Sequence, residues 1–337
     1  MSTPLVSVIM PVYNAAPFVG AAIGSVLGQT LRDFELIAID DASTDGSREI
    51  LARIADPKCR VLTNDTNLGA AETKNRGIDQ ARGEFLAFLD ADDLAIPERL
   101  ARQMEWLRAH PKTGVLGSNI EHIDPTGKSL GFFDFAETDS RVLRTQLLFR
   151  NRIAQSSVML RAAALNGMRF RREFEPAEDY DLWTRLECEL AVVGEALVRY
   201  RIHEQSVSAT KGAAMLRAVN AIHGALLRKL GRDDHENLHA AVVAADPIAS
   251  FPLFKGIERW LCSLRTANQA RAQYDPEILD LELHERWRSA GERARRLGLA
   301  GWGFWRQSLV HGGSFTTDIR LLARALRCEL ARIIQPS

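Results

Sequence analysis

Short runs of apolar, β-branched residues alternate with helical spacings through the first part of the chain. Three of these runs are VSVIMPV from Val6, FELIAI at 34–39 and EFLAFL at 84–89. Apolar runs of this length are typical of strands that are buried on both faces of a parallel sheet. Residues 17–29 have apolar positions at helical spacing, as the crossover of a βαβ unit does. The pattern predicts an open, mostly parallel α/β sheet flanked by helices.

The same alternation continues to about residue 199. Further strands are expected at 60–63, 115–120, 156–160 and 191–199. Further helices are expected at 43–55, 70–81, 97–109 and 179–189. Ser43 or Thr44 is the expected N-cap of the first of these, and Pro97 the expected first residue of the third.

The character of the sequence changes beyond Thr210. Alanine, leucine and arginine dominate there, strand signals vanish and helical periodicity continues almost to the end of the chain. We therefore expect an α/β domain at 1–210 and a helical C-terminal region at 211–337. A chain of 337 residues suits about two domains of ~150 residues each.

Charge and cysteine content exclude several classes of protein. The 43 basic and 43 acidic residues cancel, so the whole chain has no basic field of the kind that attracts nucleic acid. The four cysteines show no CxxC spacing, which argues against a zinc knuckle or a disulfide framework and favours the reducing cytoplasm. The first residues do not resemble a signal peptide, and no apolar run reaches the ~18 residues of a membrane span.

Acidic residues follow two of the predicted strands. Asp40 and Asp41 end one strand, and Asp90, Asp92 and Asp93 follow another. Ligands of open α/β sheets bind beyond the carboxyl ends of the strands, where these five carboxylates converge. Their mutual repulsion needs a cation or hydrogen-bond donors to offset it, which predicts a ligand.

Each acidic group also has a purely structural interpretation. The spacing of Asp90-Ala91-Asp92 suits one Mg²⁺ or Mn²⁺ and one hydroxyl group, but an isolated D-x-D more often marks a turn or a solvated cap. Asp40 and Asp41 are suited either to an acidic cap for the following helix or to a hydrogen bond from a nucleobase. The spacing alone leaves both alternatives open.

Five motifs, taken together and in this order, resemble family 2 glycosyltransferases of the GT-A fold. They are VSVIMPVYN at 6–14, IDDASTDGS at 39–47, NLGAAETKNRGIDQARGEFLAFLDADD at 67–93, EDYDLW at 178–183 and YRIHEQSVS at 200–208. The resemblance covers about the first 208 residues. It implies inverting, metal-dependent transfer of a sugar from a nucleoside diphosphate sugar, most often one with uracil as the base.

The resemblance also implies roles for individual residues. Asp90 would meet the ribose or the sugar, with Ala91 beside it, and Asp92 and His203 would bind the metal. Lys74 stands where the family often has Arg, and a lysine keeps a point charge for phosphate without the planar fork. The remaining nucleotide-sugar contacts would come from Pro11, Tyr13, Asn14, Asp40, Asp41 and Arg201.

Inverting displacement needs a base to take the proton of the acceptor hydroxyl. Glu178 and Asp179 are the candidates, although an acidic pair also suits the first turn of any helix. Within the motif we assign Asp179 as the base. Glu178 and Asp181 would orient it or bind acceptor hydroxyls.

The C-terminal region contains a basic segment. Residues 286–332 include ten arginines and three acidic residues, a net charge of +7. A helical stripe of Ile319, Leu322, Leu326, Leu330 and Ile333 faces either the rest of the protein or an anionic membrane surface. Trp302, Phe304 and Trp305 would assist the membrane contact, which would suit a lipid-linked acceptor at the inner face of the plasma membrane.

The sequence thus predicts an inverting glycosyltransferase that uses a nucleoside diphosphate sugar, Mg²⁺ or Mn²⁺ and a saccharide or lipid-linked acceptor in cell-surface glycan synthesis. It is also compatible with a homo-oligomer. Two alternatives remain: a sugar-nucleotide sensor without catalysis, and a phosphatase with an Asp-x-Asp nucleophile. Dinucleotide oxidoreduction is not supported, because no GxGxxG follows a strand.

Overall fold

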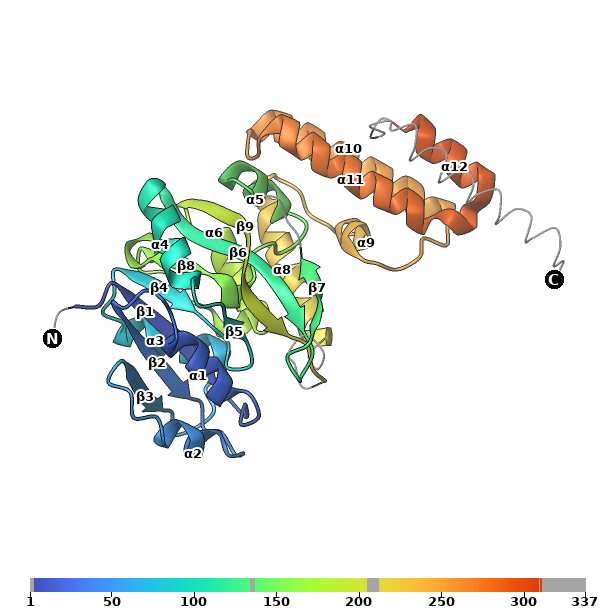
Figure 1. The fold of residues 1–337 in the computed structure, drawn as a ribbon. Helices are drawn as coiled ribbons and strands as arrows, with labels where there is room; N and C mark the ends of the chain where they lie inside the picture. The colour runs from blue at the N-terminus through green and yellow to red at the C-terminus, as the bar shows by residue number, and fades with distance from the viewer. Residues whose placement is uncertain (1–2, 134–136, 205–211, 309, 311–337) are drawn as a thin grey trace. The chain divides into compact units, whose positions relative to one another are not determined.

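The structure is a computed structural model that describes residues 3–133, 137–204, 212–308 and 310 (Figure 1). The chain divides into two compact units. The first contains Met1–Leu143 and Asn151–Val219, and the second contains Arg144–Arg150 and Asn220–Ser337. A seven-residue segment from the middle of the chain therefore belongs to the same unit as the C-terminal helices.

A nine-stranded sheet forms the centre of the first unit. Its strands are β1 Val6–Val12, β2 Phe34–Asp40, β3 Cys59–Thr63, β4 Phe85–Phe88, β5 Leu94–Ala95, β6 Thr113–Ile123, β7 Ser129–Phe133, β8 Met159–Arg161 and β9 Glu189–Arg201. The strand order is β3-β2-β1-β4-β8-β6-β9-β5, with β7 paired to β6. The α/β prediction is confirmed, and the sheet is mixed.

Strands β8, β5 and β7 run antiparallel to their neighbours, whereas all other neighbouring strands of the sheet, β6 and β9 included, are parallel. Strands β3, β2, β1 and β4 are all parallel, as the buried apolar runs predicted. Antiparallel pairing enters at β8, which lies between β4 and β6. Because β1, β2 and β4 run in one direction, with Val12 opposite Asp40 and Ile9 opposite Phe88, the residues that follow these strands emerge at one edge.

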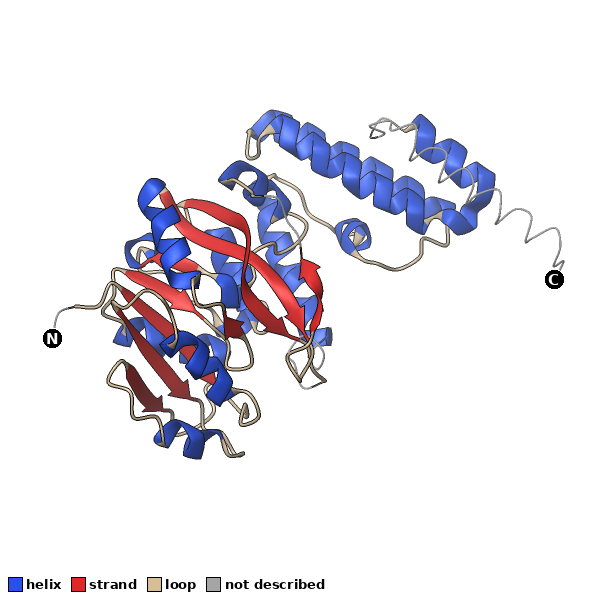
Figure 2. Ribbon diagram, viewed as in Figure 1, coloured by secondary structure: helices blue, strands red, loops and turns tan. Residues whose placement is uncertain are grey.

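Helices flank this sheet, as Figure 2 shows. They are α1 Val19–Leu27, α2 Ser47–Ala52, α3 Ala70–Gln80, α4 Arg99–Ala109, α5 Ser140–Gln146 and α6 Glu178–Arg185. Helix α3 packs closely on the strands through Gly77, where a Cβ atom would come within 2.4 Å of the Ile9 side chain. A larger side chain at this position would push α3 away from β1.

Helices α2 and α4 begin later in the chain than the sequence predicts. Helix α2 begins at Ser47 with Gly46 as its N-cap, because the Ser43 hydroxyl accepts a bond from another loop instead. Helix α4 begins at Arg99, two residues after Pro97.

The second unit is helical. Its helices are α8 Gly212–Lys229, which begins in the first unit, α9 Leu238–Val243, α10 Phe251–Arg271, α11 Pro276–Arg293 and α12 Gly298–Gln307. Helices α10 and α11 lie side by side (Figure 1). The apolar stripe predicted at 319–333 lies outside the described residues.

The aromatic residues proposed for membrane contact pack partly within this unit. The Trp305 indole is buried and donates to the carbonyl of Trp287 at 2.9 Å, and the Trp287 indole donates to the carbonyl of Trp305 at 3.0 Å. The ring of Phe304 lies 5.5 Å from that of Phe254. The expectation that Trp305 reaches a membrane is therefore wrong, because α12 turns it towards α11.

Two histidines are buried side by side in the helical unit. The rings of His223 and His239 lie 4.8 Å apart, and His239 Nε2 lies 2.9 Å from the carbonyl oxygen of Leu148. Burial, with a smaller contribution from His239, lowers the pKa of His223 to about 3. Burial likewise lowers the pKa of His239 to about 4. Both side chains are therefore neutral at neutral pH.

We expect this pair to make the helical unit acid-sensitive. Unfolded histidine titrates near pH 6.5, so below that pH the unfolded chain binds more protons and the native state loses stability. The loss has an upper bound of about 1.4 kcal/mol per pH unit for each histidine. Thermal melts between pH 7.5 and 4.5 should show a shallower pH dependence in His223→Leu, whereas a variant of the exposed His235, His235→Gln, should follow the unmodified protein. Equal slopes in all three proteins would contradict this interpretation.

Candidate active site

The loops after β1 and β2 are joined at the edge of the sheet. The backbone N–H of Asn14, which has a φ of 50°, donates to Ser43 Oγ at 3.1 Å. Asn14 Oδ1 accepts from the N–H of Thr44 at 2.8 Å. Pro11 lies within β1, and the Tyr13 side chain is 52% exposed. Tyr13 is therefore accessible to a ligand.

Asp40 is fully buried at the end of β2. Its Oδ2 accepts from Arg48 Nε at 3.0 Å, and its Oδ1 accepts from the N–H of Ser43 at 3.3 Å. The carboxylate thus holds the β2–α2 loop in place. A direct contact from Asp40 to a nucleobase stays a prediction.

Asp41 organises a different loop, the one that leads into α3. Its Oδ1 accepts from Asn64 Nδ2 at 2.7 Å and from the N–H of Leu68 at 2.8 Å. Its Oδ2 accepts from the N–H of Gly69 at 3.0 Å. Since Gly69 has a φ of 90°, the glycine in the NLGAAETKN motif permits this turn. A further contact from Asp41 to a nucleobase stays a prediction.

Asp90 and Asp93 follow β4 in a desolvated environment. Ser156 Oγ accepts from the N–H of Asp90 at 3.1 Å, and Ala91 is buried between the acidic residues. Burial raises the pKa of Asp90, with Lys74 opposing the rise and Asp92 adding to it. Burial, Asp92 and Asp90 raise the pKa of Asp93 well above its usual value. Asp90, Asp92 and Asp93 are therefore close enough to one another at this edge for their charges to interact.

Asp92 is paired with His203. His203 Nε2 lies 2.9 Å from Asp92 Oδ2, and the His203 ring lies 5.0 Å from the Phe18 ring. The N–H of Arg201 donates to Asp93 Oδ1 at 2.8 Å, which holds the end of β9 against the acidic loop. The two predicted metal ligands, 111 residues apart, are thus brought together.

This pair suits a divalent cation. The Asp92 oxygen and the His203 nitrogen are donors that Mn²⁺ accepts, and Asp93 Oδ2 is buried without a hydrogen-bond partner in the described part of the chain. Within the described ranges, no group of three or more His, Cys, Asp or Glu side chains could hold a metal by itself. A cation here needs further oxygen ligands from a substrate or from water.

Arg201 binds backbone carbonyls. Its guanidinium donates to the carbonyl oxygens of Asp92 at 2.8 Å, Asp124 at 3.0 Å and Pro125 at 2.8 Å, and lies 4.8 Å from the centre of the Phe18 ring. These contacts connect three loops around the acidic cluster. The predicted contact between Arg201 and the nucleotide remains a prediction.

Asp179 lies in the first turn of α6. Asn151 Nδ2 donates to its Oδ2 at 2.8 Å, and the N–H of Tyr180 donates to its Oδ1 at 2.6 Å. Burial and the neighbouring Glu178 raise the pKa of Asp179 to about 7, against the opposing charge of Lys74. A carboxylate with this pKa is suited to accept a proton at neutral pH.

Glu178 forms a buried ion pair with Lys74, at 2.7 Å from Nζ to Oε1. Lys74 is 4% exposed, so its ammonium is not presented at the surface of the site. Asp181 is bound by arginines: its Oδ2 accepts from Arg171 Nε at 3.0 Å and from Arg185 Nε at 2.8 Å. The expectation that Asp181 orients the base or binds acceptor is not supported by these contacts, because its carboxylate already holds α6 in place.

Three residues of this site were missed from the sequence. Asn151 bonds to Asp179, Ser156 bonds to the backbone of Asp90, and the Phe18 ring packs on Arg201 and His203. Asn151 and Ser156 belong to the stretch NRIAQSS, which precedes β8. The sequence signal that could have identified Asn151 and Ser156 was their position as polar residues just before a short apolar strand.

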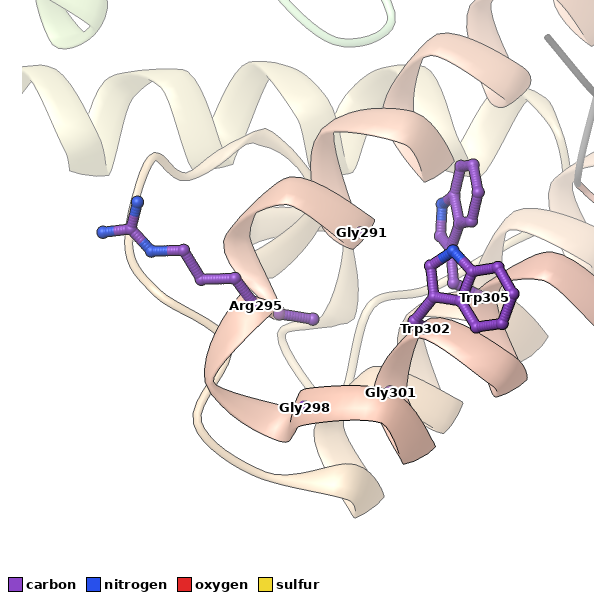
Figure 3. A pocket seen from close by; sticks show the side chains of 7 residues that line it. Gly291, Arg295, Gly298, Gly301, Trp302 and Trp305 are labelled. Carbon is purple, nitrogen blue, oxygen red and sulfur yellow. The ribbon is translucent and has the colours of Figure 1, made fainter. Parts of the chain in front are cut away.

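The second unit has a small recess between the end of α11 and α12. It is lined by Gly291, Ala294, Arg295, Gly298, Gly301, Trp302 and Trp305 (Figure 3). A Cβ atom on Gly291 would lie 2.5 Å from the Trp305 ring, so this glycine allows the two helices to approach. The lining contains no carboxylate, and the recess has none of the chemistry of the acidic edge.

The mixed sheet flanked by helices has the fold of the GT-A class of glycosyltransferases. The sequence model of Glycosyl transferase family 2 matches residues 7–164. The chain is 32% identical over 215 residues to the Escherichia coli protein named UDP-Glc:alpha-D-GlcNAc-diphosphoundecaprenol beta-1,3-glucosyltransferase WfgD, covering 63% of this chain and 82% of that protein. The chain belongs to glycosyltransferase family 2.

Two further comparisons agree with this assignment. The putative glycosyltransferase EpsE of Bacillus subtilis is 33% identical over 195 residues, which cover 55% of this chain and 67% of EpsE. The crystal structure of S. aureus TarS 1–349 in complex with UDP-GlcNAc has a TM-score of 0.55 at 19% identity, covering 98% of this chain and 92% of that chain. The latter likeness concerns the fold.

Proposed function

We propose that this glycosyltransferase transfers a hexosyl or N-acetylhexosaminyl group from a UDP-sugar to a hydroxyl of a saccharide or lipid-linked acceptor, with inversion and with Mg²⁺ or Mn²⁺. The observation that carries the proposal is the placement of Asp179, a desolvated carboxylate with a pKa of about 7, in the same unit as the Asp92–His203 pair. The names of WfgD and TarS support the choice of UDP.

The residues of the site suggest how the reaction proceeds. Asp179 takes the proton of the acceptor hydroxyl as the acceptor oxygen attacks the anomeric carbon, and Asn151 keeps the carboxylate oriented. The bond from the anomeric carbon to the diphosphate breaks, and the diphosphate leaves with the bonding electrons. Asp92 and His203 would hold a divalent cation, which would neutralise the charge of the leaving diphosphate so that it needs no proton.

A panel of nucleotides tests the proposal. Thermal shifts are measured with UDP, GDP, UDP-glucose and UDP-GlcNAc, each with and without Mn²⁺, since a ligand that binds only the native state raises the melting temperature. We expect stabilisation by UDP and its sugars that depends on Mn²⁺, followed by release of UDP when an acceptor is added. Tight binding without turnover favours a sensor, and hydrolysis of phosphomonoesters without a nucleotide favours a phosphatase.

We also propose a peripheral contact with anionic membranes through the basic C-terminal segment, in which Arg286–Arg332 has a net charge of +7. No described helix is long and apolar enough to cross a membrane. Co-sedimentation with phosphatidylglycerol vesicles at low salt, lost at high salt, would support this contact, and absence of binding would exclude it. A homo-oligomer remains a prediction.

A further inference from the structure

Helix α3 is bound along its length to the segment that leads into α6. Four pairs of residues join them by hydrogen bonds, each pair at least 90 positions apart in the chain. They are Ala71 N–H to Glu175 Oε1 at 2.7 Å, Lys74 Nζ to Glu178 Oε1 at 2.7 Å, Asn75 Nδ2 to the Phe170 carbonyl at 2.9 Å, and Arg169 Nη2 to Asp79 Oδ1 at 2.8 Å. The position of Asp179 therefore depends on α3.

Lys74 is the cation in this set that lies among the acidic residues of the site. Glu178 accepts its hydrogen bond, and the charges of Asp90 and Asp179 also act on it. Burial by itself would lower the pKa of Lys74, but Glu178 and Asp90 more than offset burial and raise the pKa. The ammonium also lies 5.4 Å from the centre of the Phe170 ring. Lys74 is thus protonated and enclosed by protein groups.

We propose that Lys74 is a positioning residue for the base: its ammonium holds Glu178 against α3, and so fixes the first turn of α6 on which Asp179 stands, instead of binding the diphosphate. This inference rests on the proposed role of Asp179. Lys74 is 4% exposed, so its ammonium would have to move away from Glu178 to meet a phosphate from solvent. A buried carboxylate without its partner is strongly disfavoured.

The charges around Asp179 explain why the ion pair matters for proton transfer. Asp179 faces the Glu178 carboxylate, the Lys74 ammonium, the Asn151 amide and the N–H of Tyr180. Without Lys74, Glu178 and Asp179 would be adjacent desolvated carboxyl groups, and such a pair shares a proton. A proton shared with Glu178 would occupy the Asp179 carboxylate, which then could not take the proton of the acceptor hydroxyl.

The experiment compares Lys74→Met, Lys74→Arg and the double variant Lys74→Met with Glu178→Gln. Lys58→Met is the matched control, because the Lys58 ammonium is bonded to the Arg32 carbonyl at 2.8 Å and is not part of the site. Calorimetric titration with UDP and Mn²⁺ measures nucleotide affinity, and kcat is measured against pH at saturating UDP-sugar. Circular dichroism shows which variants fold.

We expect Lys74→Met to bind UDP within about threefold of the unmodified affinity while kcat falls by about 100-fold, the loss of a general base. The acid limb of its pH profile should move to higher pH. Lys74→Arg should keep at least about a tenth of kcat, because it keeps the charge. The double variant should recover about tenfold over Lys74→Met, because Gln at position 178 no longer competes for the proton.

Two results would overturn the inference. The first is UDP binding weakened more than about tenfold in Lys74→Met with little change in kcat, as the loss of a phosphate ligand predicts. The second is the absence of recovery in a folded double variant. Asp179→Asn, assayed alongside, separates the two proposals. If Asp179→Asn retains turnover, the assignment of Asp179 as the base is wrong. If Asp179→Asn loses turnover and the Lys74 variants do not, only the role of Lys74 is wrong.

Discussion

Asp179→Asn should lower kcat by about 10²- to 10⁴-fold while leaving the affinity for UDP and Mn²⁺ within a factor of three, the range for removal of a general base. The amide can still accept the bond from the N–H of Tyr180, so the first turn of α6 should keep its geometry. It cannot take a proton from the acceptor hydroxyl. The loss should therefore appear in single-turnover transfer and not in nucleotide binding.

The unmodified enzyme should show the matching pH dependence. Because the pKa of Asp179 is raised to about 7, the ionised form increases through neutral pH, and kcat should rise from pH 6 to pH 8. Asp181→Asn is the control in the same helix. Its carboxylate binds Arg171 and Arg185, so this change should lower thermal stability and affect kcat much less. Equal losses of kcat in the two variants would contradict the assignment of the base.

The sequence was sufficient for the parallel strands β1, β2 and β4. Strands β1, β2 and β4 are apolar at nearly every position. Such strands have to be buried on both faces, as the central strands of a parallel sheet are. The same signal placed Asp40, Asp41 and Asp90 at one edge. Strand β8 is three residues long, and its antiparallel pairing with β4 and β6 depends on contacts that no local pattern encodes.

The partners of the charged residues could not be predicted in the same way. Resemblance placed Lys74 near phosphate, whereas the fold places its ammonium on Glu178, 104 residues further along. Each charge had several candidate partners, and tertiary packing selects among them. Asn151 was missed for this reason, since an amide is informative only once Asp179 is seen beside it.

Removal of the Asp92 carboxylate should weaken the binding of Mn²⁺. Asp92→Asn keeps the size of the side chain but loses the carboxylate paired with His203, so we expect Mn²⁺ affinity to fall by at least about tenfold, the cost of about 1.4 kcal/mol of binding. In transfer assays kcat/KM should fall by about 10²- to 10³-fold at fixed Mn²⁺, because the leaving diphosphate loses charge neutralisation. Higher Mn²⁺ should restore part of this activity.

A comparison of three variants makes the metal assignment specific. His203→Gln keeps a polar group but loses the ring nitrogen 2.9 Å from Asp92, and should shift the Mn²⁺ dependence in the same direction by a smaller amount. Asp33→Asn changes an exposed carboxylate that precedes β2, at the opposite edge of the sheet, and should leave the Mn²⁺ dependence unchanged. Manganese binding followed by electron paramagnetic resonance in the absence of sugar separates metal affinity from catalysis. If Asp92→Asn bound Mn²⁺ as tightly as the unmodified protein, the cation would have to be held by other residues.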